Sequence, residues 1–330
     1  IEAVKRLGKA LGISFLTLGV SPLWSRSETP VMPKGRYGIM RAYMPKVGTM
    51  GLDMMFRTTT VQVNLDFSSE ADMVRKLQVS LALQPLATAL FANSPVMDGH
   101  SNGFLSKRGE IWRNTDADRS GLIPFAFETG MGFERYVDWA LDVPMYFVKR
   151  GDVYHDVAGA SFRDLMAGRL AALPQERATL SDWANHVSTL FPDVRLKRYL
   201  EMRGADAGPP DMIKALPAFW VGLLYDPSTL AAAFDLVKPW TAQERQAMRD
   251  DVPKQALAAR IKGRTLQDVA KDVLQLSAQG LKARGLGEEI YLAPLEVIAA
   301  SGQTRAQLLL ARYGSDWRAQ AERIFTEQIF

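Results

Sequence analysis

The sequence has no cysteine among its 330 residues. Disulfides, thiolate metal sites and cysteine nucleophiles are therefore excluded, and a reducing compartment fits best. Histidine is scarce as well. His100, His155 and His186 do not stand at metal-ligand spacing, and we expect each in a loop or on the surface. The patterns GxSxG, GxxxxGK[ST] and GxGxxG do not occur, so a nucleophile-elbow hydrolase, a P-loop and a Rossmann fingerprint are all unsupported.

Long hydrophobic runs and an excess of one charge are missing too. The apolar stretch from residue 3 to residue 20 is interrupted by charged residues and glycines, so it cannot span a bilayer. The net charge is +4, from 40 basic and 36 acidic residues, with no basic patch of the kind that binds nucleic acid. We therefore expect a cytoplasmic protein that binds neither membrane nor nucleic acid, with an oligomeric state that the sequence does not give.

One stretch that is present, "TTTVQVNLDF" (58–67), alternates strictly between apolar and polar residues, as a half-buried strand does. Its polar face carries Gln62 and Asn64, and Asn is a poor strand residue. Uncharged amides both donate and accept hydrogen bonds, which suits a ligand cleft. The alternative is an ordinary solvated face.

A second stretch, "RLKRYLEMR" (195–203), alternates as well. One face of the predicted strand carries charged and phenolic side chains, which are Arg195, Lys197, Tyr199, Glu201 and Arg203. Arg198 falls on the opposite, apolar face unless a bulge intervenes. Arginine forks match carboxylate and phosphate groups, so the charged face is a candidate anion site. A solvated face with cross-strand ion pairs is the competing interpretation.

The remaining pattern separates a strand-rich front from a helical tail. We predict a helix at 2–11, a strand at 13–19, strands between 31 and 65, a helix from Ser69 to Asn93 bent by Pro85, a long loop at 99–121 that contains Arg108, Trp112, Asp116 and Arg119, and a strand at 141–148. From residue 209 onward, capping-box spacings at Thr241, Thr265 and Thr304 predict helices. The fold class is therefore α+β with segregated elements, divided into a sheet-containing region (1–208) and a helical region (209–330).

Several long stretches resemble the plant-type glutamate–cysteine ligases, a branch that many proteobacteria share. They are "MPKGRYGIMRAYMPKVG" (32–48), "GLDMMFRTTTVQVNLDFSSEADM" (51–73), "LALQPLATALFANSP" (81–95), "RLKRYLEMRGAD" (195–206) and "ALPAFWVGLLYD" (215–226). The resemblance implies a glutamine-synthetase-like fold, in which a curved antiparallel sheet forms a funnel. It also implies ATP-dependent phosphorylation of the γ-carboxylate of L-glutamate, followed by attack of the amine of L-cysteine, in the first step of glutathione synthesis.

The resemblance also assigns roles to the polar residues. Arg203 and Arg108 become candidates for the phosphate or the glutamate carboxylate and are our predicted catalytic residues. Glu201 becomes the candidate contact for Mg²⁺ or for an amine. The candidates for binding ATP, or the metal and its waters, are Gln62, Asn64, Arg198 and Tyr199. Arg36 is a further candidate.

Two departures from that family affect the expectation. Its members carry an N-terminal segment, of about a hundred residues or more, whose acidic strands bind the catalytic Mg²⁺ ions. We expect this chain to begin after that segment, so the funnel would be partial and the activity of the chain alone is in question. Redox control through cysteine pairs should be absent. Two alternatives stay open: a ligase that joins glutamate to another amine, and a non-catalytic fragment that serves only as a binding module.

Overall fold

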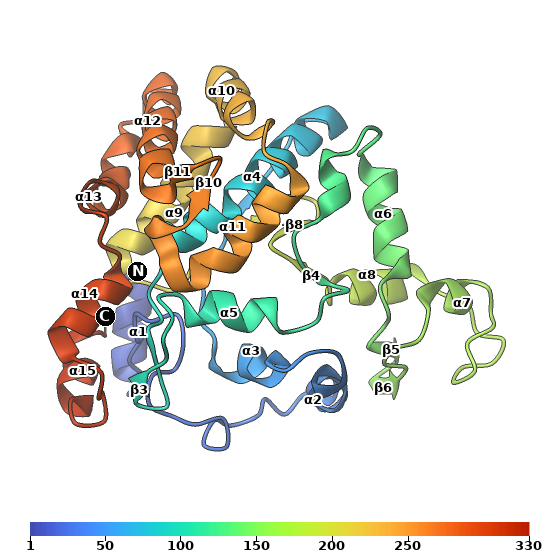
Figure 1. The fold of residues 1–330 in the computed structure, drawn as a ribbon. Helices are drawn as coiled ribbons and strands as arrows, with labels where there is room; N and C mark the ends of the chain where they lie inside the picture. The colour runs from blue at the N-terminus through green and yellow to red at the C-terminus, as the bar shows by residue number, and fades with distance from the viewer. Residues whose placement is uncertain (330) are drawn as a thin grey trace.

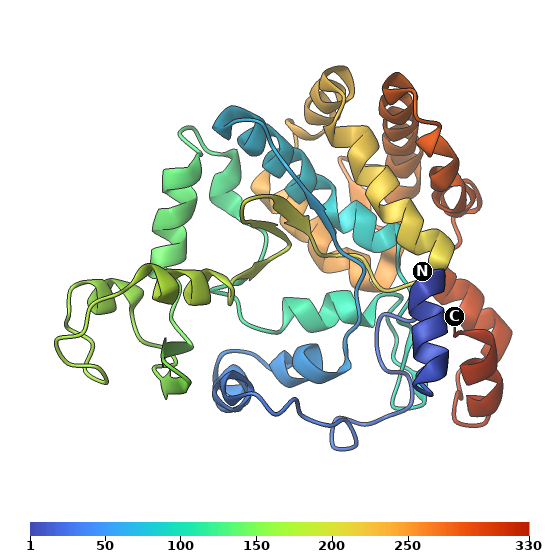
Figure 2. The same ribbon diagram turned by 180° about the vertical axis from the view of Figure 1, so that it is seen from behind.

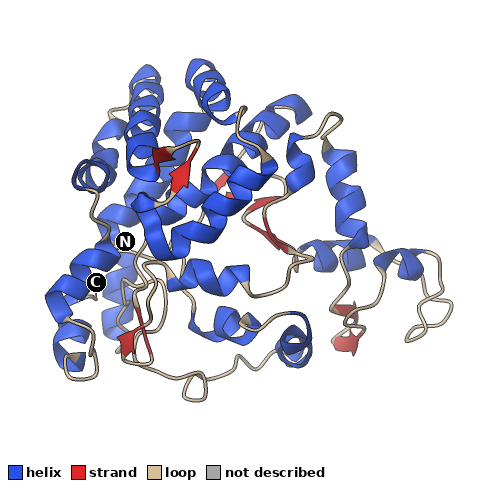
Figure 3. Ribbon diagram, in the orientation of Figure 1, coloured by secondary structure: helices blue, strands red, loops and turns tan. Residues whose placement is uncertain are grey.

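The computed structural model describes residues 1–329 and has a mixed architecture in which helices dominate (Figures 1 and 3). The predicted α+β class is confirmed at this level. The strands are short and lie in one three-stranded sheet and four strand pairs among the described residues. The N-terminal helix and the last helices lie side by side in both views (Figures 1 and 2), and Leu16 forms a β-bridge with Ile329.

Helix α4, Glu70–Leu90, runs through the middle of the molecule between the C-terminal helices and the sheet (Figure 1). Ser69 caps it by accepting a hydrogen bond from the backbone N–H of Asp72, as predicted. The helix is apolar on nearly every side and is buried from Val79 to its end. Pro85 lies inside the helix, which ends at Leu90, three residues before the predicted end.

The central sheet consists of β1 (Val63–Leu65), β9 (Leu200–Met202) and β8 (Val194–Leu196), in that order and all antiparallel. Its outer rows are apolar, with Leu65, Leu200 and Leu196 aligned across the strands, and they face α4. The middle row consists of Asn64, Glu201 and Arg195, whose side chains point to the opposite face. The alternation in the sequence therefore predicted the two faces correctly.

The predicted single strand at 195–203 is wrong. The chain folds back on itself as a hairpin, with Lys197, Arg198 and Tyr199 in the turn and the N–H of Lys197 donating to the carbonyl of Tyr199 (2.8 Å). Arg195 and Glu201 are six residues apart, and pairing across the hairpin puts them directly opposite each other. The even spacing of polar residues fits a hairpin as well as it fits one long strand, so periodicity alone did not distinguish the two.

The predicted strands between 31 and 65 are also wrong except at β1. Helices α2 (Gly35–Val47) and α3 (Gly51–Arg57) occupy most of this region. Met40 and Met44 are four residues apart, as on one face of a helix, and both are buried. The helical spacing of these methionines was not recognised in the sequence, because the two glycines of α2 and Pro45 near its end are unusual in helices. The predicted helix at 2–11 is confirmed as α1, Glu2–Ala10, whereas the predicted strand at 13–19 forms only bridges.

The middle of the chain folds into short elements. The predicted loop at 99–121 contains α5, which Ser106 caps, and the predicted strand at 141–148 begins only at Phe147. The elements are β2 (Val96–Met97), β3 (His100–Ser101), α5 (Lys107–Arg113), β4 (Ser120–Gly121), η1 (Pro124–Phe127), α6 (Phe133–Asp142), β5 (Phe147–Arg150), β6 (Val153–Asp156), α7 (Phe162–Met166), α8 (Leu180–Val187) and β7 (Phe191–Pro192).

The C-terminal part is helical, as predicted, apart from one small strand pair. Capping boxes at Thr241 and Thr304 are confirmed, and Thr265 caps its helix. The elements are α9 (Pro210–Leu224), α10 (Pro227–Val237), α11 (Ala242–Gln255), η2 (Ala256–Ala258), β10 (Arg260–Ile261), β11 (Arg264–Thr265), α12 (Leu266–Arg284), η3 (Glu288–Leu292), α13 (Ala293–Ser301), α14 (Arg305–Tyr313) and α15 (Ala321–Glu327). Within residues 1–329, no helix combines the length and the apolar character needed to cross a bilayer.

The prediction for His186 is wrong, because this residue is buried in α8 rather than exposed. Its ring stacks on Phe162, and Nε2 lies 2.7 Å from the carbonyl oxygen of Ala140. Burial lowers the pKa of His186 to about 4, more than the hydrogen bond to Ala140 raises it. The folded chain therefore holds this imidazole neutral at physiological pH.

We expect His186 to make the stability of the protein depend on pH. The unfolded chain takes up the proton near pH 6.5 and the folded chain only near pH 4, so the free energy of unfolding should fall by about 3 kcal/mol as the pH drops through this window. Urea denaturation of wild type and His186→Gln across the window measures this contribution. Equal pH dependence in the two proteins would contradict it.

Helices α9 and α12 approach so closely that there is no room for a side chain at Gly280, because its Cβ would lie 1.9 Å from the carbonyl oxygen of Gly222. We expect Gly280→Ala to lower the free energy of unfolding by about 1–3 kcal/mol, since the helices must separate. Gly38→Ala in α2 is the matched control. A Cβ there meets nothing within 4 Å, so the substitution should raise stability by about 0.5–1 kcal/mol. Chemical denaturation of both variants tests the pair.

Candidate functional site

The polar face of the central sheet has one carboxylate surrounded by cations. Glu201 is fully buried, and its oxygens accept from Arg195 Nη2 (2.8 and 3.1 Å), Lys197 Nζ (2.8 Å) and Arg203 Nη1 (2.5 Å). Three cations around one carboxylate leave a local charge of +2. Burial by itself would raise the pKa of Glu201, but the hydrogen bond from Lys197 and the two arginine charges hold it below its ordinary value. Glu201 is therefore ionised, and the face attracts anions.

Arg203 extends from the end of β9 into aromatic surroundings. Its guanidinium carbon lies 5.3 Å from the ring centre of Trp112 and 5.5 Å from that of Phe191, and the two rings meet edge to face. Burial, together with the nearby charge of Arg195, lowers the pKa of Arg203. Contacts with two aromatic faces favour a charged guanidinium in a place with little water.

Arg108 lies beside Arg203 and forms no ion pair with an acidic side chain of the described residues. It is 2% exposed, and its guanidinium donates one hydrogen bond, from Nη2 to the carbonyl of Arg203 (2.7 Å). Its Nε is buried without a partner, and no carboxylate within residues 1–329 forms an ion pair with it. Burial lowers its pKa to about 10, with Asp206 opposing that change and Arg203 adding to it. Arg108 thus remains charged at neutral pH, and an anion beside it would be stabilising.

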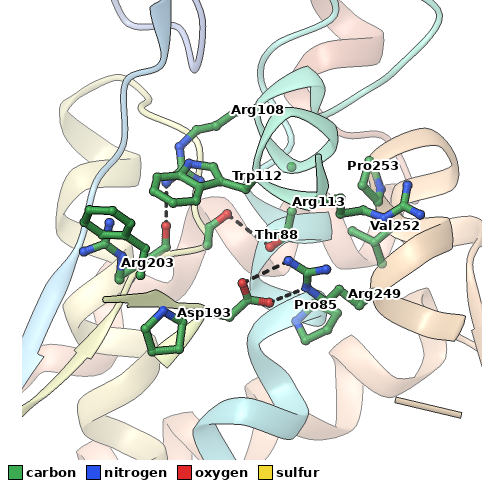
Figure 4. A pocket seen from close by; sticks show the side chains of 14 residues that line it. Pro85, Thr88, Arg108, Trp112, Arg113, Asp193, Arg203, Arg249, Val252 and Pro253 are labelled. Atoms are coloured by element: carbon green, nitrogen blue, oxygen red, sulfur yellow. Dashed lines mark hydrogen bonds and ion pairs between the residues drawn. The ribbon is translucent and has the colours of Figure 1, made fainter. Parts of the chain in front are cut away.

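A small pocket of about 40 Å³ lies between these arginines and helix α11 (Figure 4). Arg108 and Arg203 flank Trp112 on one side of it. On another side, Asp193 accepts from Arg249 Nε (2.6 Å). Because Arg249 belongs to α11, the pocket is built jointly by residues from the sheet-containing part and from the helical part of the chain.

Comparison of the whole sequence with known proteins identifies the family of this chain. The family model for glutamate-cysteine ligase family 2 (GCS2) matches residues 1–327. The chain belongs to this family. Among relatives, it is 54% identical over 327 residues to glutamate–cysteine ligase B, chloroplastic, of rice (Oryza sativa subsp. japonica), and also 54% identical to the chloroplastic enzymes of Arabidopsis thaliana and Solanum lycopersicum.

The chain is shorter than these relatives. The alignments cover 99% of this chain but 66% of the rice enzyme, 63% of the Arabidopsis enzyme and 62% of the tomato enzyme. The chain thus spans slightly less than two thirds of the length of the curated GCS2 proteins that it matches.

Some predicted site residues come together in this GCS2 chain and others do not. Arg108 and Arg203 both line the pocket and are joined by a hydrogen bond. Glu201 lies next to them through its ion pair with Arg203. Both amides are exposed: Gln62 lies just before the edge strand β1, and Asn64 lies within it, aligned with Glu201. Arg198 is exposed in the hairpin turn, while Tyr199 is half-buried next to Lys197. None of these four lines the pocket, and neither does Arg36 of α2.

The loop residues Asp116 and Arg119 have a structural role. Arg119 is 1% exposed and donates to Asp116 (2.6 Å) and to the carbonyl of Pro144 (2.6 Å), and its guanidinium stacks on Tyr146 at 3.7 Å. These contacts hold the segment after α5 against the residues that immediately precede β5. The sequence analysis grouped Asp116 and Arg119 with Arg108. The sequence alone does not show which of the two arginines has an ion-pair partner.

Sequence reasoning missed Phe191, Asp193 and Arg249 as pocket residues. Asp193 and Arg249 are 56 positions apart and stand in unrelated patterns, so no local spacing indicated that they pair. Trp112 was named among the residues of the predicted loop, without a role beside the arginines. The pairing depends on how α11 packs against α4 and α5, which periodicity does not specify.

The GCS2 chain offers few ligands for a metal. No group of three or more His, Asp or Glu side chains in the described part of the chain could hold an ion. Mg²⁺ is commonly bound by one or two carboxylates, with substrate phosphates and waters completing the shell. Glu201 does not fit this role as it stands, because its oxygens accept from three cations and the local charge of +2 disfavours a further cation.

Arg108 and Arg119 provide a matched pair of substitutions. We expect Arg119→Met to lower the free energy of unfolding by about 3–5 kcal/mol, because Asp116 would be left buried and unpaired. Arg108→Met removes a buried charge that has no carboxylate partner, so stability should stay level or rise by up to about 2 kcal/mol. Urea denaturation compares the two variants. An equal loss in both would mean that Arg108 is compensated within the protein.

Proposed function

We propose that this chain forms the catalytic region of an ATP-dependent ligase, which joins the γ-carboxylate of L-glutamate to the amine of L-cysteine as the first step of glutathione synthesis. Two observations support the proposal. The chain belongs to glutamate-cysteine ligase family 2, and its relatives at 54% identity are named glutamate–cysteine ligases. Arg108, which is buried and forms no ion pair with a carboxylate of residues 1–329, lies at the side of the cationic sheet face.

The observation that carries the proposal is Arg108. A buried guanidinium is costly unless an anion compensates it, and proteins retain such groups where they bind one. Arg203 is adjacent, and among the described residues only Nη1 of its guanidinium forms a side-chain hydrogen bond, which leaves donors for a ligand. Two neighbouring forks suit a carboxylate or a phosphate group, both of which the reaction contains.

In the proposed reaction, an oxygen of the glutamate γ-carboxylate takes the γ-phosphoryl group of ATP and ADP leaves. The amine nitrogen of cysteine then attacks the carbonyl carbon of this acyl phosphate. A C–N bond forms, the C–O bond to phosphate breaks, and the amine loses a proton. Phosphoryl transfer depends on positioning and on neutralising charge. Arg203 and Arg108 would hold the anionic groups of substrate and intermediate.

Further roles follow from the same proposal. Gln62, Asn64, Arg198 and Tyr199 would contact ATP at the exposed edge and turn of the sheet. Glu201 would hold Arg195, Lys197 and Arg203 in place beside the anionic groups of the substrates. Mg²⁺, when bound, would neutralise phosphate charge. The three-stranded sheet would form one wall of a glutamine-synthetase-like funnel within the region 1–208. The region 209–330 would support that wall from behind and contribute Arg249 to the pocket.

Mass spectrometry for γ-glutamylcysteine tests the proposal. The chain would be incubated with ATP, Mg²⁺, L-glutamate and L-cysteine, with the rice enzyme as positive control and other amines offered in parallel. We expect product from the wild type and a loss of about 100-fold or more in Arg203→Met, because one charge-stabilising group is removed. Arg163→Met, which changes an exposed ion pair, should retain activity.

Calorimetry gives a second readout, because this chain spans less than the full length of its relatives. We expect L-glutamate or ATP to bind the wild-type chain and to bind Arg108→Met more weakly. A chain that forms no product and binds neither ligand would refute the proposal. Product with a different amine would keep the ligase class and change the acceptor.

A further inference from the structure

Trp112 makes contacts that the proposed reaction does not by itself explain. Its indole ring lies under two guanidinium groups, with the Arg203 carbon 5.3 Å and the Arg108 carbon 5.9 Å from the ring centre. Figure 4 shows the ring close to both side chains. Phe191 meets the indole edge to face at 5.9 Å, which fixes the orientation of the ring.

The two arginines repel each other, and each charge makes the other harder to bury. Of these two arginines, Glu201 pairs with Arg203, whereas no carboxylate within residues 1–329 forms an ion pair with Arg108. The negative face of an indole attracts cations, and tryptophan does so most strongly among the aromatic residues. Trp112 is therefore the group that both guanidinium groups share, together with the hydrogen bond from Arg108 to the Arg203 carbonyl.

We infer that Trp112 is a positioning residue, whose ring holds Arg108 and Arg203 side by side so that they bind one carboxylate or phosphate group of the substrate together. This inference rests on the proposed function, because it takes the two arginines as the substrate anion site. Trp112 itself acts only through them.

Substitution of Trp112 can remove the π face without removing a hydrogen bond. The indole Nε1 is buried without a hydrogen-bond partner among the described residues, so Trp112→Phe removes no hydrogen bond. The phenyl ring keeps a weaker π face, and Trp112→Leu removes the π face entirely. The same two substitutions at Trp139 are the matched control. Trp139 packs edge to face on Tyr136, and it does not line the pocket.

The first measurement is the dissociation constant of L-glutamate by calorimetry. We expect affinity to fall about 3- to 10-fold in Trp112→Phe and at least about 30-fold in Trp112→Leu, since two cation–π contacts weaken together. The Trp139 variants should bind as the wild type does. Equal affinity in wild type and Trp112→Leu would overturn the inference.

The second measurement needs no ligand. In nitrogen-15 NMR spectra, the Nε–H signals of Arg108 and Arg203 should be displaced by the indole ring in the wild type, and both should shift in Trp112→Leu. If neither signal shifts, the inference is overturned, whatever the affinity. If both shift but the wild type binds no L-glutamate, the positioning by Trp112 is supported and the proposed function fails instead.

Discussion

The buried carboxylate of Asp206 holds together the segments on which the site is built. It accepts hydrogen bonds from the backbone N–H of Asn93 and the hydroxyls of Ser94 and Ser106, at 2.7–2.9 Å. Asn93 and Ser94 lie just after α4, and Ser106 is the N-cap of α5. Asp206 itself lies four residues after the end of β9. One side chain thus fixes the end of the central helix, the cap of the helix that carries Arg108, and the exit of the hairpin that carries Arg203. Gly19 is required beside it, because a Cβ there would lie 2.6 Å from the carboxylate carbon.

Asp206 fixes the positions of the cations without neutralising them. It acts on Arg108 at a distance, since no ion pair joins them, while Glu201 takes three cations at once. The polar face of the central sheet, opposite to α4, therefore carries more positive than negative charge. Such an excess costs stability, and natural proteins commonly accept this cost at binding sites.

The two faces of the central sheet and several helix starts could be predicted from the sequence, for definite physical reasons. Alternation predicted that Glu201 and Arg203 lie on one face of a strand. The structure has a hairpin instead of one long strand, but the prediction still holds, because side chains two residues apart lie on the same face in either arrangement. Ser69, Thr241 and Thr304 identified helix starts, because a cap is a local interaction. The helix at 35–47 was missed because Gly35, Gly38 and Pro45 suggest loops, whereas burial of Met40 and Met44 determines the outcome. The pairing of Asp193 with Arg249 depends on tertiary packing, which no local pattern records.

The position of Arg249 has a consequence for the order in which the protein can form. Synthesis proceeds from the N-terminus, so β8, β9 and α5 leave the ribosome well before α11. Until α11 has emerged and packed, Asp193 lacks its partner and the pocket lacks one wall. During this part of synthesis, the cationic residues of the sheet are already present in the nascent chain, but the pocket that would enclose an anion is incomplete. Ligand can assist folding only after most of the chain has been made.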